Sequence, residues 1–301
     1  MKLISDFEIN PFTTVNYVST EAKTIWKPLI QECSELIQRL ELISVAEGQR
    51  KCAWQTVAVN RIAQLTITCM ALGLNVYPIH NIATWGDGFA HKVKPATENG
   101  PTSTYCIISK DIVDAQAFRS AYENGNHLLQ GEFLGFPECC TEFFNKNWPE
   151  YYDPIWQAAE NTKSKNLIDD ETIEIEEPNQ ISNPILRYIG LRVGFHIPCS
   201  LGCAYTAAAG IERLSLCKTN KDKDAAETLL ALLSMPMEWS VLHGIALVKT
   251  PIFYVRANSL PAIKKYTIKL MGKFIPKEAM PGKNFPFNIK NKINKNKGDS
   301  K

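Results

Sequence analysis

Hydrophobic residues recur at helical spacing in the first part of the chain. Between residues 20 and 46 they fall at three- and four-residue intervals, which predicts one long amphipathic helix. Residues 53–72 show similar spacing and stop near Gly73, which predicts a second helix. The pattern then changes to short apolar runs typical of strands, at residues 74–80, 88–94 and 103–110.

The later part of the chain favours helices joined by loops. Asp111 is a typical N-cap residue before a helical pattern, and the acidic run at 168–180 is interpreted as a solvated surface loop. Residues 237–258 are interpreted as two strands meeting near Lys249, with His243 and Gly244 interrupting the first. The fold class predicted from these patterns is α+β, mostly helical with a small antiparallel sheet and a late β-hairpin.

Three regions follow from the same patterns. Residues 1–110 are predicted to form a helix pair with a small sheet, and residues 111–282 a second domain that carries most of the unusual chemistry. Residues 283–301 are rich in lysine and asparagine with little to bury, so we expect a disordered basic tail.

The composition and the absence of certain motifs argue against several classes of function. Apolar residues make up 45% of the chain and the formal net charge is +2, which is typical of a globular protein and gives no strong signal for nucleic acid or anionic membranes. The sequence contains neither a GxxxxGK[ST] loop nor a GxGxxG turn opening a helix. Without a recognisable secretion signal or membrane-length apolar run, we expect a cytoplasmic protein whose nine cysteines are reduced.

Four of those cysteines stand in two short stretches, "GFPECC" at 135–140 and "HIPCSLGC" at 196–203. In both, a proline precedes a predicted helix start, where unpaired N–H groups and the helix dipole favour thiolate. Thiolate is the form of cysteine that binds metals and attacks electrophiles. The pattern predicts that the two stretches converge on one site, with these metal ligands: Cys139, Cys140, Cys199 and Cys203.

The spacing of the four cysteines does not decide which metal or cluster they bind, or whether they bind one. Neither stretch has the C-x2-C knuckle of common zinc sites, and adjacent cysteines are expected to strain around one small ion, so an iron–sulfur cluster is the first interpretation. Beside such a cluster, His196 could donate to a cluster sulfide or replace one cysteine as ligand. Zinc is the alternative, in a Cys3His site made of His196, Cys199, Cys203 and one of the adjacent pair. A metal-free thiol site and a purely structural role for the cysteines also stay open.

Nearby polar residues suggest catalysis. His196 and Glu138 flank the cysteines and can act as bases, and His243 interrupts an apolar strand beside a glycine that would let a ligand approach. The sequence therefore predicts a metal-binding enzyme acting on a small molecule, with His196, Glu138 and His243 as catalytic candidates. The alternatives are a non-catalytic protein with a structural metal that binds a partner, or a metal-free thiol enzyme.

The stretches "LGFPECCTEFF", "HIPCSLGC" and "LHGIALVKTPIFYV" resemble an uncharacterised prokaryotic family with G-[FY]-P-x-C-C and H-x-P-C-S-x-x-C elements and a late strand ending near T-P. The similarity covers about residues 128–256 and leaves residues 1–110 out. It implies that the four cysteines and His196 belong together. It implies no particular reaction.

Overall fold

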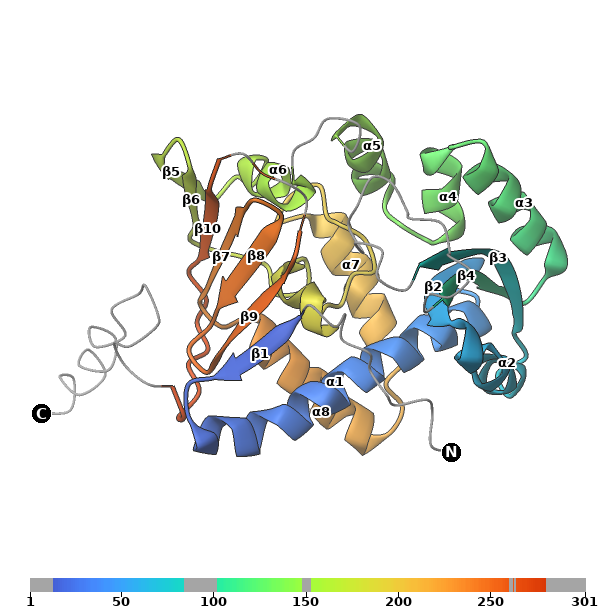
Figure 1. Ribbon diagram of the computed structural model, residues 1–301, viewed down its shortest axis with the longest axis horizontal. Helices are drawn as coiled ribbons and strands as arrows, with labels where there is room; N and C mark the ends of the chain where they lie inside the picture. The colour runs from blue at the N-terminus through green and yellow to red at the C-terminus, as the bar shows by residue number, and fades with distance from the viewer. Residues whose placement is uncertain (1–12, 84–101, 148–152, 260–261, 263, 280–301) are drawn as a thin grey trace, which may run out of the picture.

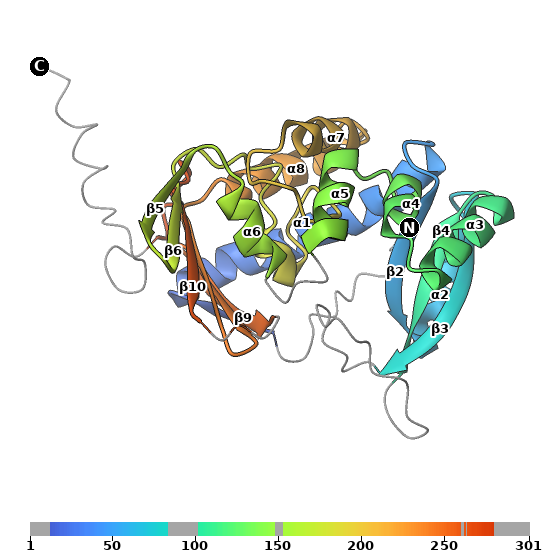
Figure 2. The same ribbon diagram turned by 90° about the horizontal axis from the view of Figure 1, so that it is seen from above.

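Two β-sheets lie at opposite ends of the molecule, and the long helix α1 (Thr20–Ala46) runs from one to the other (Figures 1 and 2). The computed structural model describes residues 13–83, 102–147, 153–259, 262 and 264–279. Ser19 caps α1 by accepting a hydrogen bond from the Ala22 N–H, and Pro28 lies within the helix. The prediction of a helix over residues 20–46 is confirmed.

The larger sheet has seven strands in the order β1-β9-β8-β7-β10-β6-β5. Neighbouring strands are antiparallel except β10 and β6, which run parallel, so the sheet is mixed. Its strands are β1 (Thr14–Tyr17), β5 (Lys165–Asp169), β6 (Thr172–Ile175), β7 (Met237–Leu242), β8 (Ile245–Lys249), β9 (Phe253–Asn258) and β10 (Tyr266–Leu270).

The main core lies between this sheet and the helices beside it. Alternate residues of the central strands, such as Trp239, Val248 and Phe253, are fully buried in one cluster with the apolar stripe of α1. Helix α8 (Asn220–Leu233) lies along α1, and α6 (Pro154–Glu160) packs against β6 and β10. This core therefore fixes α1 and the C-terminal strands in one unit.

The smaller sheet has the order β2-β4-β3, all antiparallel. Its strands are β2 (Cys52–Ala58), β3 (Asn75–Ala83) and β4 (Thr102–Ser109). Ile108 on β4 packs in a cluster with α1 and α2 (Ile62–Met70), and its neighbour Ile107 packs in another with α3 (Ile112–Glu123) and α4 (His127–Phe133). Both faces of this sheet are therefore covered.

The predicted fold class, mostly helical with a small antiparallel sheet and a late β-hairpin, is wrong: the structure has a seven-stranded mixed sheet beside a three-stranded one. One reason is the acidic run, which forms strands β5 and β6 rather than a loop. Ile173 and Ile175 are fully buried while the alternate residues Thr172 and Glu174 are not, which is the two-residue period of a half-buried strand. The charge of the run concealed this alternation.

Two further differences complete the correction. Residues 52–58 form β2, paired along its length with β4, and the helix α2 begins only at Ile62 after a short 3₁₀ turn, η1 (Val59–Arg61). The late segment forms three strands, β7, β8 and β9, instead of a two-stranded hairpin. Tertiary pairing with β4 overrode a local pattern that was compatible with a helix.

The remaining elements lie between the two sheets. Helices α5 (Glu138–Asn147) and α7 (Ala204–Leu214) occupy the middle of the molecule in both views, and the 3₁₀ turn η2 (Ile185–Ile189) is buried in the main core (Figures 1 and 2). The expected strand at 88–94 and the expected tail at 283–301 lie outside the described residues. Among the described helices, none combines the length and apolar character that a membrane crossing requires.

Candidate metal centre

The four predicted cysteines meet in the middle of the molecule. Their sulfur atoms all lie within 4.8 Å of one another. The Cys139 Sγ is 3.8 Å from the sulfurs of Cys140, Cys199 and Cys203, and the Cys140 and Cys203 sulfurs are 3.7 Å apart. These separations are far longer than the roughly 2 Å of a disulfide bond, so the four thiols are free. The prediction that the two stretches converge is confirmed.

The first two ligands come from the opening turn of α5. The Pro137 carbonyl accepts hydrogen bonds from the N–H groups of Cys140 and Thr141, which starts the helix directly after the proline. From sequence, adjacent cysteines are expected to be strained around one ion. The tight first turn instead brings the Cys139 and Cys140 sulfurs to 3.8 Å, with Cys140 buried and Cys139 half-buried.

The other two ligands come from the loop that leads into α7. Cys203 is the N-cap of α7, and its Sγ accepts from the Thr206 N–H at 3.4 Å. The loop is held by side chains from elsewhere in the fold: Asn161 donates to the Cys199 carbonyl and Ser182 to the Cys203 carbonyl. Neighbouring segments therefore help to position both cysteines.

Hydrogen-bond donors point at the sulfurs. The Cys199 N–H lies 3.3 Å from the Cys140 Sγ, and the Thr206 hydroxyl lies 3.3 Å from the same atom. Together with the Thr206 N–H on Cys203, these contacts stabilise negative charge on sulfur. Thr206 was not predicted as a site residue, because its position three residues after Cys203 carries no recognisable motif.

The protein alone does not ionise all four thiols near neutral pH. Burial, followed by the repulsion of the Cys203 charge, raises the pKa of Cys139 and raises the pKa of Cys199 to about 12. Burial also raises the pKa of Cys140. Burial acts in the same direction on Cys203, but the hydrogen bonds from Thr206 outweigh it and lower its pKa to about 7. Four thiolates in this space require a bound cation.

His196 lies next to the four sulfurs and is linked to them through Thr206. Its Nε2 is 2.9 Å from the Thr206 Oγ1, which in turn contacts Cys140, and its ring lies 5.0 Å from the Phe136 ring. Burial, followed by the nearby charges of Arg213 and Arg192, lowers the pKa of His196 to about 3, so the imidazole is neutral at physiological pH. His196 therefore reaches the sulfurs through Thr206 and is absent from the group of four mutually close sulfur ligands.

The other two catalytic candidates lie elsewhere on their elements. Glu138 is exposed in the first turn of α5, next to Cys139 in the chain. His243 is exposed and occupies the turn between β7 and β8, with a backbone φ of 50°. Its N–H donates to the Ala262 carbonyl at 2.9 Å. The structure therefore brings His196 to the cysteines through Thr206, whereas His243 belongs to a hairpin of the large sheet.

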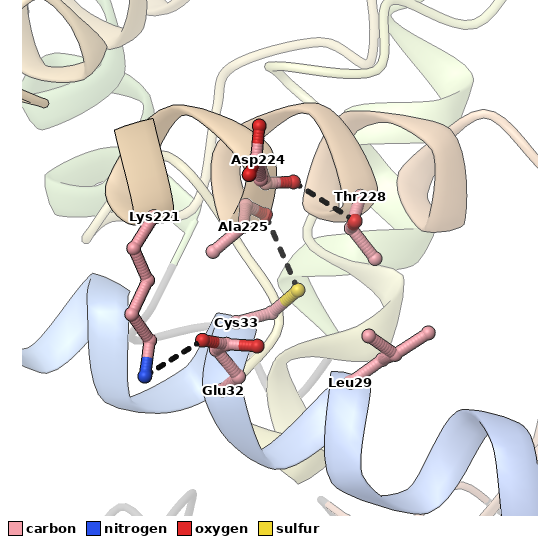
Figure 3. A pocket seen from close by; sticks show the side chains of 7 residues that line it. All are labelled: Leu29, Glu32, Cys33, Lys221, Asp224, Ala225 and Thr228. Atoms are coloured by element: carbon pink, nitrogen blue, oxygen red, sulfur yellow. Dashed lines mark hydrogen bonds and ion pairs between the residues drawn. The ribbon is translucent and has the colours of Figure 1, made fainter. Parts of the chain in front are cut away.

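A shallow hollow between α1 and α8 is a second concave feature (Figure 3). Of its charged residues Glu32, Lys221 and Asp224, the first two form an ion pair at 3.0 Å. The Cys33 thiol donates to the Ala225 carbonyl, and burial together with the Glu32 charge raises the pKa of Cys33 to about 12. This thiol is therefore neutral, and the hollow lacks the reactive groups of the metal centre.

Comparisons of this chain with protein-family models, with curated proteins and with solved structures found no match. The function of the protein is therefore inferred from the geometry of the site.

Proposed function

We propose that this protein binds one zinc ion through Cys139, Cys140, Cys199 and Cys203 in a closed tetrahedral site. The supporting observation is the spacing of the sulfurs. Four thiolates at the usual Zn–S length of about 2.3 Å form a tetrahedron with edges of about 3.8 Å. Four of the six sulfur pairs are 3.7 or 3.8 Å apart, and all six are within 4.8 Å.

The same spacing argues against the iron–sulfur cluster that was the first interpretation of the sequence. In a [4Fe–4S] cluster each thiolate binds a different iron, so the cluster itself separates the sulfurs more widely than one shared ion does. The cysteines would have to move apart to admit it. A single iron in the same tetrahedron is distinguished from zinc by its colour and by metal analysis.

Four protein ligands complete the coordination of zinc, and catalytic zinc sites keep one position open for water or substrate. The geometry therefore favours a structural ion over the predicted enzyme centre. The ion would join the first turn of α5 to the loop before α7, two segments about sixty residues apart in sequence that meet between the two sheets. This corresponds to the non-catalytic alternative of the sequence analysis.

The test is metal analysis of protein purified without oxygen. We expect about one zinc ion per chain, no visible absorbance, and loss of zinc from the variant Cys199→Ala together with a lower Tm. The matched control is Cys217→Ala, which removes a buried cysteine outside the site and should keep the zinc. Iron with sulfide and a brown colour, or full zinc retention in Cys199→Ala, would refute the proposal.

All nine cysteines are free thiols. This supports a location in a reducing compartment such as the cytoplasm, where thiols persist. Membership of the family with G-[FY]-P-x-C-C and H-x-P-C-S-x-x-C elements is likewise a proposal, supported by the convergence of both elements on one site.

A further inference from the structure

Three arginines surround one aromatic ring beside the metal centre. The guanidinium carbons of Arg50, Arg213 and Arg192 lie 4.8, 4.2 and 5.8 Å from the centre of the Phe195 ring. They come from three separate places in the chain. Arg50 lies in the segment between α1 and β2, Arg192 in the loop before α7, and Arg213 in the last turn of α7. We call Arg50, Arg192 and Arg213 the cationic cluster.

The cluster is buried but incompletely paired. The side chain of Arg50 is 2% exposed; it donates to the Ser44 hydroxyl and the Glu41 carbonyl, yet its Nη1 has no partner among the described residues. Arg213 is 5% exposed and donates to the Val193 carbonyl, and its Nε has none either. Buried donors without a partner are rare in folded proteins, because each loses its contact with water.

The local charge is also unbalanced. Glu41 is the carboxylate that pairs with the cluster, at 3.3 Å from Arg50. Half-buried Arg192 makes no ion pair or hydrogen bond within the described residues, and its guanidinium lies over the face of Phe195. Arginine cannot neutralise itself by losing a proton at physiological pH, so buried guanidinium charges require an anion. Exposed Glu212 also attracts Arg213, and Arg187 adds a positive charge near Arg192, so the charges around the cluster are net positive.

We infer that the cationic cluster binds the phosphate group of a small molecule or free inorganic phosphate. Guanidinium groups match oxyanions through paired N–H donors. A phosphate monoester carries close to two negative charges at neutral pH, so it offsets this net positive charge more fully than a single carboxylate does. The unpartnered Nη1 of Arg50 and Nε of Arg213 provide donors, and half-buried Arg192 provides the approach from solvent.

Other features join this site to the metal centre. Phe136 of the first cysteine stretch packs at a tilt against His196, the residue after Phe195, and the Cα of Gly135 faces the Arg50 side chain. The buried Nδ1 of His196 is a third atom without a partner in the described part of the chain. The arginines do not stabilise the thiolates through hydrogen bonds, because no described arginine donates to any of the four sulfurs.

The test measures thermal unfolding of the full metal-loaded chain in inorganic phosphate, in a simple phosphate monoester and in acetate, each at fixed ionic strength. We expect phosphate or the monoester to raise Tm saturably, and acetate to do so much less. The variant Arg192→Gln should weaken phosphate binding about tenfold or more, because it removes a charged donor. The same variant should raise Tm in phosphate-free buffer, because it relieves repulsion within the cluster.

Arg119→Gln is the matched control, since it removes an exposed arginine on α3 and should keep the phosphate response. If Arg192→Gln proves poorly folded, Arg192→Lys keeps the charge without the guanidinium fork and should bind phosphate more weakly than the parent. No Tm response to either phosphate compound, or an unchanged response in both Arg192 variants, would overturn the inference. Zinc content is measured separately, so failure here is distinct from failure of the metal proposal.

Discussion

Single residues of the stretch 135–140 connect the candidate metal centre to the segments around it. Gly135 has a φ of 65°, which side-chain-bearing residues seldom adopt, and a Cβ placed on it would lie 2.8 Å from the Arg50 Cβ. Phe136 contacts His196, Pro137 opens α5, and Cys140 binds at the centre. The residues of the stretch "GFPECC" therefore have different structural roles. Its glycine is required for the backbone conformation and the close approach to Arg50, as its cysteines are required for the group of four sulfurs.

Gly135→Ala should lower the free energy of unfolding by about 2 kcal/mol or more, because it adds a steric clash to the left-handed backbone strain. Gly125→Ala is its control: Gly125 has a φ of 64° and open space where the new methyl group would lie, so we expect about 1 kcal/mol from the backbone alone. Urea denaturation of both variants gives the comparison. Equal effects would show that the contact with Arg50 is unimportant.

Among the elements, the β7–β8 hairpin explains why His243 attracted attention. Leu242 pairs with Ile245, so His243 and Gly244 are the two residues of the turn, with φ of 50° and 78°. Positive φ at both positions is the type I′ turn that suits the right-handed twist of a hairpin. The pair was interpreted as an interruption for a ligand, but its geometry is that of a turn, and a His-Gly pair between alternating apolar residues is its sequence signal.

His243→Asn should therefore stabilise the protein slightly, by about 0.5 kcal/mol, because asparagine adopts positive φ more readily in type I′ turns. Zinc content should not change, since the residue lies outside the group of four sulfurs. Denaturant midpoints and metal analysis of the purified variant test both statements. A variant that lost its zinc would make His243 a site residue after all.

Across the whole molecule, metal binding is coupled to protonation and to the arrangement of the sheets. The four sulfurs come from segments between the two sheets, and α1 contributes to the cores of both. Without metal, the thiols of Cys139, Cys140 and Cys199 have raised pKa values and are protonated at pH 7, while Cys203 with a pKa of about 7 is half ionised. If the site binds zinc, as proposed above, the ion must displace these protons.

Zinc binding at pH 7 should release between three and four protons per ion. The apparent affinity should therefore rise by about three orders of magnitude per pH unit above pH 7, and fall more steeply below pH 7 as Cys203 also becomes protonated. Calorimetric titration of the metal-free protein in buffers of different ionisation enthalpy measures the number of protons. Release of one proton or fewer would mean that most of the thiolates exist before the metal arrives.

The sequence by itself determined the local features: the helix at 20–46, the N-caps, the strand character of β3 and β4, and the two proline-led cysteine stretches as one site. The helix, the cap and the strand character depend on residues close together in the chain, where spacing and backbone preference decide the outcome. The convergence of the cysteines could be inferred because both stretches carry the same chemistry.

The tertiary structure alone decided the larger sheet, the size of the space between the sulfurs and the cationic cluster. Strand β6 pairs in parallel with β10, some ninety residues later, and such pairing depends on burial that a charged local sequence conceals. Arg50, Arg192 and Arg213 share no spacing, and each alone is typical of a surface residue. Whether thiols hold one ion or a cluster depends on distances of an ångström or two, which are set by packing between segments and not by any one of them.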